Sequence, residues 1–435
     1  MTSDPAEPAP AEPAPSTPAP ASGPAPDSAR WGTRFLYHLW SANAFTVTAL
    51  AIVLALLIGA VLIVVSDAEV RATYGYLFAR PGDALTASWE RISDAYATLF
   101  RGAVVDPGAI GRALDGTGSW AAVFGPSSET LTAAAPLVFT GLAFALAFRG
   151  GLFNIGVQGQ TILGAIGAGL AGFLLPLPVL LHLVLALLAG GLAGAAWAFG
   201  PGILKARTGA HEVITTIMLN SVAAIFIGWV IIQSWALDQS RQGAISHPVD
   251  QSARLPRLFG WLDPGLRVHL GILVALAAVA GVAWLLNRSS VGFELRAVGL
   301  NPQAARVAGM SVTGTYVLVM VIAGGLAGLG GATVVLGTAY ALTTLVAGSV
   351  GFDGILVGLL GRAKPWGVFA AALLFGALQA GGRAMQTGSG ISLELVQVIQ
   401  ALIVIFVAAP ALVKATFGLR AIRIGRISGV AARGW

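Results

Sequence analysis

The segment VGFELRAVGLNPQAARVAGM, residues 291–310, places charged and amide side chains between two long apolar runs. Asn301 can act as an N-cap, and Pro302 suits the first position of the helix that would follow. Ala304 and Ala305 would give this short helix a low-profile face on which another protein could dock. A plain solvated loop is the alternative interpretation. The residues predicted to dock a partner are Glu294, Arg296, Gly299, Asn301, Ala304, Ala305 and Gly309.

Two glycines frame the predicted docking helix. Gly299 would permit a tight turn ahead of the Asn301 cap, and Gly309 would end the helix. We expect Ala305 to lie against the partner, where a bulky substitution would overpack the contact.

Amide side chains gather at the start of two apolar runs. GLFNIGVQGQTILGAIGAG (residues 151–169) carries Asn154 and Gln158, which are four positions apart and share a helix face. HEVITTIMLN (residues 211–220) ends in Asn220. Amides donate and accept hydrogen bonds without the cost of burying a charge, which suits the passage of a polar neutral solute. Hydrogen bonding between helices is the alternative.

Asp353, in VGFDGILVGLLG, is the main acidic residue within the apolar runs. Acidic residues at membrane depth are functional candidates by default, although a helix-end acid that caps backbone N–H groups is an equally good interpretation here. One such acid is thin support for proton coupling. The residues predicted to lie near a solute pathway are Asn154, Gln158, Asn220 and Asp353.

Several catalytic motifs are missing. None of the three lysines, Lys205, Lys364 and Lys414, is followed by Ser or Thr, so the chain has no phosphate-binding loop of the GxxxxGK[ST] type. HEVIT at residues 211–215 lacks the second histidine of the zinc-protease motif, and there is no GxSxG or cysteine. We therefore expect no catalytic residues, no metal, no cofactor and no nucleotide hydrolysis by this chain.

The composition is that of an integral membrane protein. Hydrophobic residues make up 56% of the 435 residues, charged residues only 10%, and the mean hydropathy is +0.81. The net charge of +6 is attributed to the distribution of Arg and Lys among loops, which reports topology, and not to nucleic-acid binding.

Ten apolar runs are candidate membrane spans, each near the length of about 20 residues that a bilayer requires. Leu345–Leu360 is short and could be a broken or re-entrant segment. The runs are Phe45–Val65, Leu131–Phe148, Leu152–Leu175, Val179–Leu204, Val213–Trp235, Val268–Leu286, Thr313–Leu336, Leu345–Leu360, Trp366–Gly382 and Leu393–Val413.

The positive-inside rule orients these spans. With both termini in the cytoplasm, every short inner loop carries Arg or Lys, including residues 287–312. Residues 1–29 form a Pro/Ala-rich cytoplasmic tail that is predicted to be disordered and dispensable, and residues 414–435 form a basic cytoplasmic tail. The predicted membrane-spanning domain is residues 30–413.

The membrane domain contains one long external loop, residues 66–130, with an amphipathic stretch SWERISDAYATLFRGAV. A surface helix at the membrane interface is the favoured interpretation. A docking surface for an external partner is the alternative.

Four motifs, in chain order, resemble one family. LRAVGLNPQAARVAGM resembles the cytoplasmic coupling segment of ABC importer permeases of the branched-chain amino acid, ribose and nucleoside group. FRGGLFNIGVQGQ, HEVITTIMLN and GFDGILVGLLGRAKPWGV resemble permeases of nucleoside and simple-sugar uptake systems, which are served by basic-membrane-protein-type lipoproteins. The resemblance covers approximately residues 130–413.

The resemblance implies a fold of about ten transmembrane helices like that of vitamin B12-type (type II) importers. It implies a permease subunit in the cell membrane, two cytoplasmic ABC ATPases that hydrolyse ATP, a second and often non-identical permease, and an external substrate-binding lipoprotein. The solute would be a small polar molecule, with nucleosides favoured over ribose-like sugars. The family typically has an acid where Gln158 stands. A stand-alone secondary carrier or channel is the alternative class, followed by a membrane-embedded enzyme.

Overall fold

The computed structural model describes residues 44–417, and its regular elements in that range are helices. Eight of these helices are long and apolar enough to cross a membrane, which confirms the prediction of an all-α polytopic membrane protein. They are α2 (Ala44–Ser66), α6 (Trp120–Arg149), α7 (Val157–Leu174), α8 (Val179–Thr208), α9 (Glu212–Ile231), α10 (Gly271–Arg288), α13 (Val312–Val334) and α15 (Pro365–Gly388). The predicted tail of residues 1–29 and most of residues 414–435 lie outside the described range.

Two further apolar helices, α14 (Val350–Leu360) and α16 (Leu393–Ala408), are shorter, and α17 (Pro410–Thr416) follows the second. Before α14, the chain of α13 continues as a π-helical turn, η2 (Val335–Ala339), and stops at Tyr340. Tyr340 adopts a left-handed backbone conformation with φ of 56°. No helix follows until Val350, so the predicted span at residues 345–360 is a broken one.

The segment predicted as one long external loop, residues 66–130, is largely helical. It contains α3 (Ala68–Tyr74), α4 (Pro81–Ala103), α5 (Pro107–Leu114) and the first turns of α6. Pro81 and Pro107 stand at helix starts, where a missing N–H costs nothing. Hydropathy placed the start of the second span at Leu131, because the polar residues of the first turns of α6 hide a helix that begins at Trp120.

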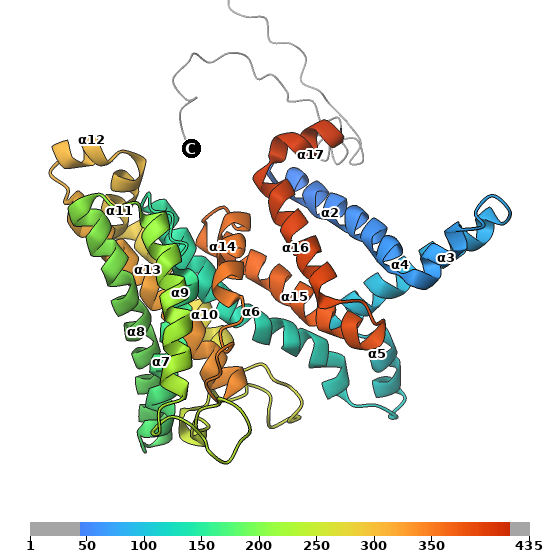
Figure 1. Cartoon of the computed structure of the whole chain (residues 1–435), viewed down its shortest axis with the longest axis horizontal. Helices are drawn as coiled ribbons and strands as arrows, with labels where there is room; N and C mark the ends of the chain where they lie inside the picture. The colour runs from blue at the N-terminus through green and yellow to red at the C-terminus, as the bar shows by residue number, and fades with distance from the viewer. Residues whose placement is uncertain (1–43, 418–435) are drawn as a thin grey trace, which may run out of the picture.

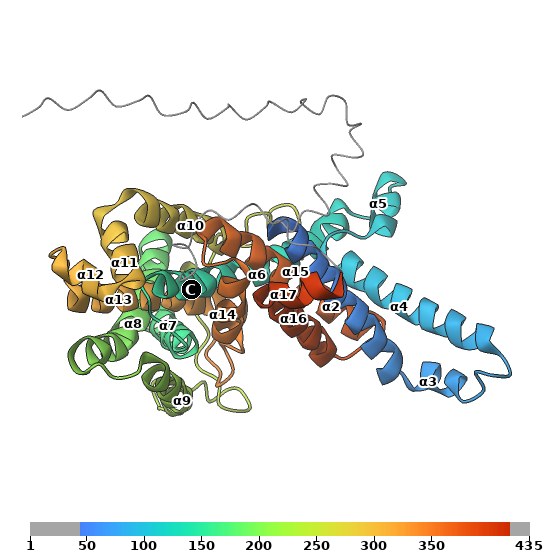
Figure 2. The same cartoon turned by 90° about the horizontal axis from the view of Figure 1, so that it is seen from above.

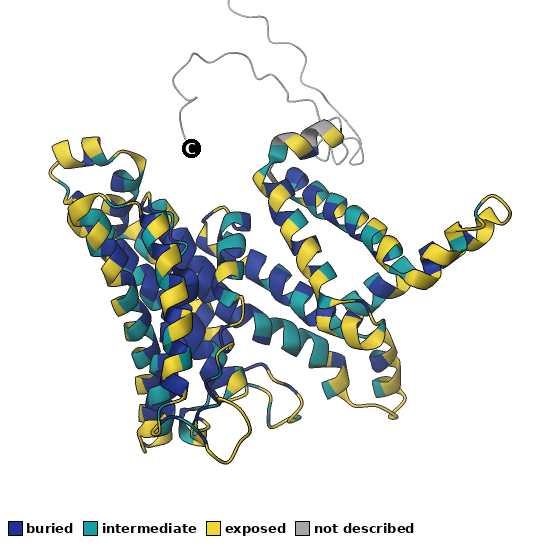
Figure 3. Cartoon of the chain, viewed as in Figure 1, coloured by how far each residue is buried: buried dark blue, intermediate teal, exposed yellow. Residues whose placement is uncertain are grey.

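Helix α6 forms the centre of the molecule. In its most apolar window 83% of the residues are buried, compared with 28% in α2 and in α8. It passes between a group formed by α7, α8, α9 and α13 and a group formed by α2, α4, α15 and α16 (Figure 1). The buried residues follow α6, α7 and α13, whereas the outer faces of α8 and α9 are exposed (Figure 3).

Close backbone contacts hold the first group together. A side chain at Gly164 of α7 would collide with Gly328 of α13, and one at Gly194 of α8 would collide with the carbonyl of Gly324. Small residues at such crossings let membrane helices approach until their backbones touch.

Two segments mark the two ends of the molecule. Helices α11 (Ser290–Leu300) and α12 (Pro302–Val307) lie together at one end, called here the α12 end (Figure 1). Helix α5 and residues 232–270, which include the 3₁₀ turn η1 (Gln251–Ala253), lie at the opposite end (Figure 1). Helices α3 and α4 project from the rest of the molecule (Figure 2).

Candidate functional site

The predicted docking helix is present as α12. The Asn301 side chain accepts hydrogen bonds from the backbone N–H groups of Gln303 and Ala304, at 3.1 and 3.0 Å, so Asn301 is the N-cap that the sequence indicated. Gly309 follows the helix with φ of 83°, a left-handed conformation that favours glycine, and so ends the helix as predicted.

One residue of this segment does not face outward. Ala305 is only 4% exposed and packs against Val298 of α11 and Val312 of α13, so the expectation that it lies against a partner is wrong. With 3.6 residues per turn, neighbouring positions on a short helix point in different directions, and the sequence did not show which alanine faces inward. Ala304 is exposed.

The exposed apolar side chains at the α12 end were missed by the sequence analysis. Leu300 and Val307 are 87% and 91% exposed, and Phe293 is 57% exposed. The sequence could have indicated them, because each lies in a segment expected to face the cytoplasm. An uncovered apolar side chain in such a segment marks an interaction surface. Together with Ala304, they form the docking surface considered below.

Gly299 also has a different function from the predicted turn. It lies inside α11, where a Cβ atom would collide with the Arg149 carbonyl and with the backbone of Gly150 and Gly151. It therefore lets α11 touch the end of α6, which fixes the position of the docking helix on the membrane bundle.

A basic cavity of about 310 Å³ lies beside the same segment. Arg149, Arg296 and Lys364 line it, together with Trp366, which is 57% exposed. Arg296 also donates to the Gly292 carbonyl at 3.2 Å, while Glu294 is exposed. The α12 end thus presents apolar side chains next to a basic cleft.

The predicted pathway amides Asn154, Gln158 and Asn220 are buried and satisfied by other protein groups. Asn154, fully buried, pairs with Gln160 through two amide–amide hydrogen bonds of 3.0 and 3.2 Å. The Asn220 amide accepts from Gly159 N–H at 2.8 Å and donates to the Ile155 carbonyl at 2.9 Å, which ties α9 to the start of α7.

Gln158 performs a similar task at the broken span. Its side-chain nitrogen donates to the Gly348 carbonyl at 2.7 Å, and its side-chain oxygen accepts from Gly351 N–H at 2.9 Å. Both contacts are with the backbone at the start of α14. The amide therefore provides hydrogen-bond partners for a backbone that is not helical at this depth.

Asp353, in the first turn of α14, is separate from these amides and lines a cavity of about 230 Å³ between α14, α15 and α16, called here the Asp353 cavity. Its Oδ2 atom accepts hydrogen bonds from Ser349 at 2.9 Å and from Gln379 at 3.1 Å. Gln400 of α16 also lines this cavity; it is 5% exposed, and its amide has no hydrogen-bond partner among residues 44–417. Gln379 and Gln400 were not singled out from the sequence, because isolated glutamines in long apolar helices match no motif.

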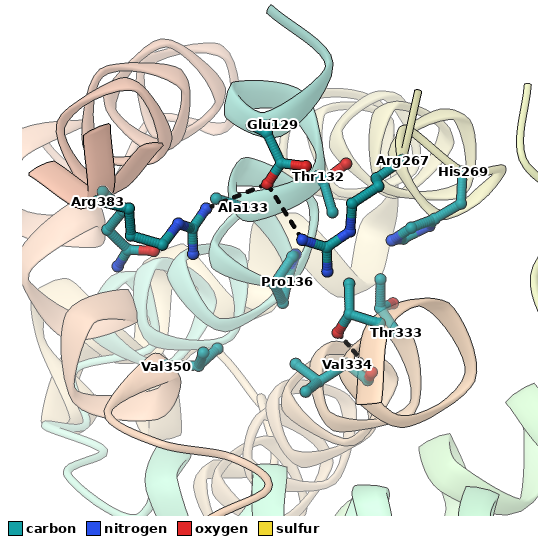
Figure 4. Close-up of a pocket in the computed structure, with 12 residues that line it drawn as sticks. Glu129, Thr132, Ala133, Pro136, Arg267, His269, Thr333, Val334, Val350 and Arg383 are labelled. Carbon is teal, nitrogen blue, oxygen red and sulfur yellow. Dashed lines mark hydrogen bonds and ion pairs between the residues drawn. The ribbon is translucent and has the colours of Figure 1, made fainter. Parts of the chain in front are cut away.

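A second cavity of about 200 Å³ adjoins the first and shares Val350, Gln379 and Arg383 with it. Glu129 of α6 lies between two arginines, and its Oε2 atom is 3.4 Å from Arg267 and 3.5 Å from Arg383 (Figure 4). These charges lie toward the end of the molecule opposite α12. We call this the Glu129 cavity.

The imidazole of His269 also lines the Glu129 cavity. Burial, together with the nearby charges of Arg267 and Arg257, lowers the pKa of His269 to about 4, so the ring is neutral at physiological pH. Its Nδ1 atom accepts from Gly271 N–H at 3.1 Å, which places the proton on Nε2. No group of three or more His, Cys, Asp or Glu side chains suited to a metal ion occurs among the described residues.

Residues 127–408 match the family model described as branched-chain amino acid transport system / permease component. The match covers more than half of the chain. The chain belongs to this permease family. The resemblance seen in the four sequence motifs is thereby confirmed, and the chain is a transport component. No solved structure matches the chain.

Three related permeases show which members of the family are similar. A guanosine ABC transporter permease of Bacillus subtilis is 42% identical over 303 residues, covering 69% of this chain and 86% of the relative. A nucleoside ABC transporter permease of Lactococcus lactis is 39% identical, covering 64% and 78%. A glucose ABC transporter permease of Haloferax volcanii is 37% identical, covering 64% and 75%.

Proposed function

We propose that this permease is the membrane-spanning subunit of an ATP-driven ABC importer that carries nucleosides into the cytoplasm. The observation that carries the proposal is the 42% identity to the guanosine permease over most of both chains. The adjoining Asp353 and Glu129 cavities support it, because amide, hydroxyl and carboxylate groups suit the hydrogen-bonding edges of a nucleobase and a ribose.

The α12 end is the proposed docking surface for the partner ATPase. Leu300, Ala304 and Val307 offer uncovered small and apolar contacts, and Arg149, Arg296 and Lys364 line the cleft beside them. These cations also favour a cytoplasmic location for the α12 end and hence for both termini. A second permease subunit and an external substrate-binding lipoprotein complete the proposed importer.

The test of the transported solute is uptake by cells that carry the importer, compared with cells that lack this chain. Labelled guanosine, adenosine, ribose and glucose are supplied separately. We expect the loss of the chain to abolish uptake of the nucleosides and to spare uptake of both sugars. A simple-sugar permease is the second candidate, favoured by the similarity to the glucose permease, and the opposite pattern of uptake would establish it.

The test of the docking surface is co-purification of the ATPase with this permease. Val307→Asp places a charge on a side chain that is 91% exposed and should release the ATPase without loss of the permease from the membrane. Asp250→Asn, on an exposed residue at the opposite end, is the matched control and should retain the ATPase. Full retention with Val307→Asp would show that α12 is an ordinary loop helix.

A further inference from the structure

Helix α2 has an apolar face that no part of the described chain covers. Val53, Leu57, Val61 and Val65 follow one another at intervals of four residues, and their exposed fractions lie between 46% and 60%. In a membrane-spanning helix such a stripe faces the lipid acyl chains. Because the stripe ends at Val65, the boundary of the acyl region lies close to the end of α2.

An ion pair holds α4 at this boundary. Asp67, directly after α2, caps α3 by accepting hydrogen bonds from two backbone N–H groups, and its Oδ2 atom is 2.7 Å from the Nε atom of Arg91 in α4. The hydrogen bond from the Val70 N–H and the charge of Arg91 lower the pKa of Asp67 below its ordinary value. The carboxylate therefore stays ionised near neutral pH, and the ion pair fixes the height of α4 relative to α2.

The second half of α4 packs against the membrane bundle. The Tyr96 hydroxyl donates to the Leu56 carbonyl of α2, and Ser389, just after α15, donates to Asp94 at 2.8 Å. A side chain at Gly102 would collide with Ala384 of α15. This half of α4 therefore packs against the middle of α2 and the end of α15, so the rest of the helix has a defined direction.

The first half of α4, together with α3, extends beyond the bundle (Figures 1 and 2). It carries exposed apolar side chains. Phe78 is fully exposed, Trp89 is 71% exposed and Leu85 is 68% exposed, and Tyr74 and Tyr76 are about half exposed. These five residues are called here the hairpin tip. The Tyr74 hydroxyl lies 3.0 Å from the hydroxyl of Ser88 in α4, whereas most of the surface of Phe78, Leu85 and Trp89 is uncovered by residues 44–417.

We propose that the hairpin tip lies in the interfacial region of the lipid leaflet that surrounds this end of α2. Tyr and Trp concentrate at this depth because their rings are apolar and their polar atoms reach water. Arg71 precedes the tip and Arg80 lies within it, and their long side chains can reach the lipid phosphates while the aromatic rings lie deeper. With the proposed topology, this is the outer leaflet.

Two observations favour lipid over a protein partner. The hairpin begins where the lipid-facing stripe of α2 ends, because Asp67, the N-cap of α3 and the partner of Arg91 in α4, comes two residues after Val65. The hairpin also lies outside residues 127–408, which match the permease family, so the partners that family members share do not require it. The inference does not depend on which solute is transported.

Depth measurements on the full chain in lipid vesicles test the proposal, and the absence of cysteine makes single labels unambiguous. Phe78→Cys and Trp89→Cys carry a fluorophore in vesicles of phosphatidylcholine and phosphatidylglycerol. Val61→Cys, on the lipid-facing stripe, and Gln242→Cys, in an exposed loop between α9 and α10, are the matched controls. Quenchers attached to lipid and dissolved in water are compared at each site.

We expect both tip labels to be quenched by lipid-borne nitroxide more than Gln242→Cys and less than Val61→Cys, with emission shifted to shorter wavelength than at Gln242→Cys. Quenching by water-soluble iodide equal to that at Gln242→Cys would overturn the proposal. So would protection that appears only after the second permease or the external lipoprotein is added, because that outcome indicates a protein contact.

The unmodified chain provides an independent measurement. Trypsin does not cleave the Arg80–Pro81 bond, so residues 72–91 leave as one peptide that contains the whole tip. A lipid-dissolved photoactivated carbene should label this peptide, whereas the loop peptide of residues 242–254 should stay unlabelled. Equal, background labelling of both peptides would overturn the proposal without reliance on any substitution.

Discussion

The amides around α7 and the polar groups around α14 are chemically similar, but they differ in whether protein groups satisfy their hydrogen bonds. Asn154, Gln158 and Asn220 form hydrogen bonds with protein groups that would otherwise be unpaired. In the Asp353 cavity, by contrast, Gln400 is 5% exposed with no partner among residues 44–417, and both recorded hydrogen bonds of Asp353 end on one oxygen. Amides whose hydrogen bonds are satisfied by protein groups stabilise the fold, whereas polar groups without protein partners remain available to a solute.

The largest effect that separates the two regions is expected for Asn220→Leu. The substitution leaves the Gly159 N–H and the Ile155 carbonyl unpaired, and each unpaired group should lower the free energy of unfolding by about 1–3 kcal/mol. Thermal unfolding of the purified permease measures this change. Uptake should fall only in proportion to the loss of folded protein; unchanged stability with lost uptake would place Asn220 in the pathway instead.

Asp353→Asn tests the other region. The substitution keeps the shape of the side chain and an oxygen that can accept from Ser349 and Gln379, so the unfolding temperature should stay close to that of the original chain. If Asp353 contacts the solute, uptake at limiting solute should fall about tenfold, equivalent to 1.4 kcal/mol. A fall in unfolding temperature that accounts for the whole loss of uptake would make Asp353 a structural residue.

Gln400→Leu should lower transport without lowering stability. The buried amide has no partner among the described residues, so an apolar side chain of similar size should leave the free energy of unfolding unchanged or raise it by up to about 1 kcal/mol. Uptake should nevertheless fall, because a hydrogen-bonding group is removed from the cavity wall. Parallel unfolding and uptake measurements check both signs, and a destabilised variant would contradict the comparison.

The smallest effect is expected for Glu129→Gln. The carboxylate lies between Arg267 and Arg383, but about half of each arginine side chain is exposed, and such ion pairs contribute about 0–1 kcal/mol. The difference in unfolding temperature between the variant and the original chain should disappear at high salt. A large, salt-independent loss of stability would show that Glu129 is a buried structural group like the amides of α7.

The sequence predicted most of the membrane helices, because a helix in lipid needs an unbroken apolar run. The N-cap at Asn301 and the helix end at Gly309 were equally readable, since both depend on local backbone conformation. Helix α4 was predicted as an amphipathic surface helix, yet half of it braces α2 and α15 through Tyr96 and Gly102. Those partners lie far away along the chain, so no local pattern could indicate them.

The amino-acid sequence alone determined the membrane class, the short helix α12 and the resemblance to the permease family. Only the tertiary structure decided which polar side chains form hydrogen bonds within the protein: it paired Gln158 with the backbone of Gly348 and Gly351. It also decided which small side chains of α12 are buried, because Ala305 faces inward and Val307 is exposed. The physical reason is that an amide side chain has the same chemistry whether it bonds two helices together or lines a solute pathway. Its function depends on whether a partner from a distant segment reaches it, and distances between segments arise only when the helices pack.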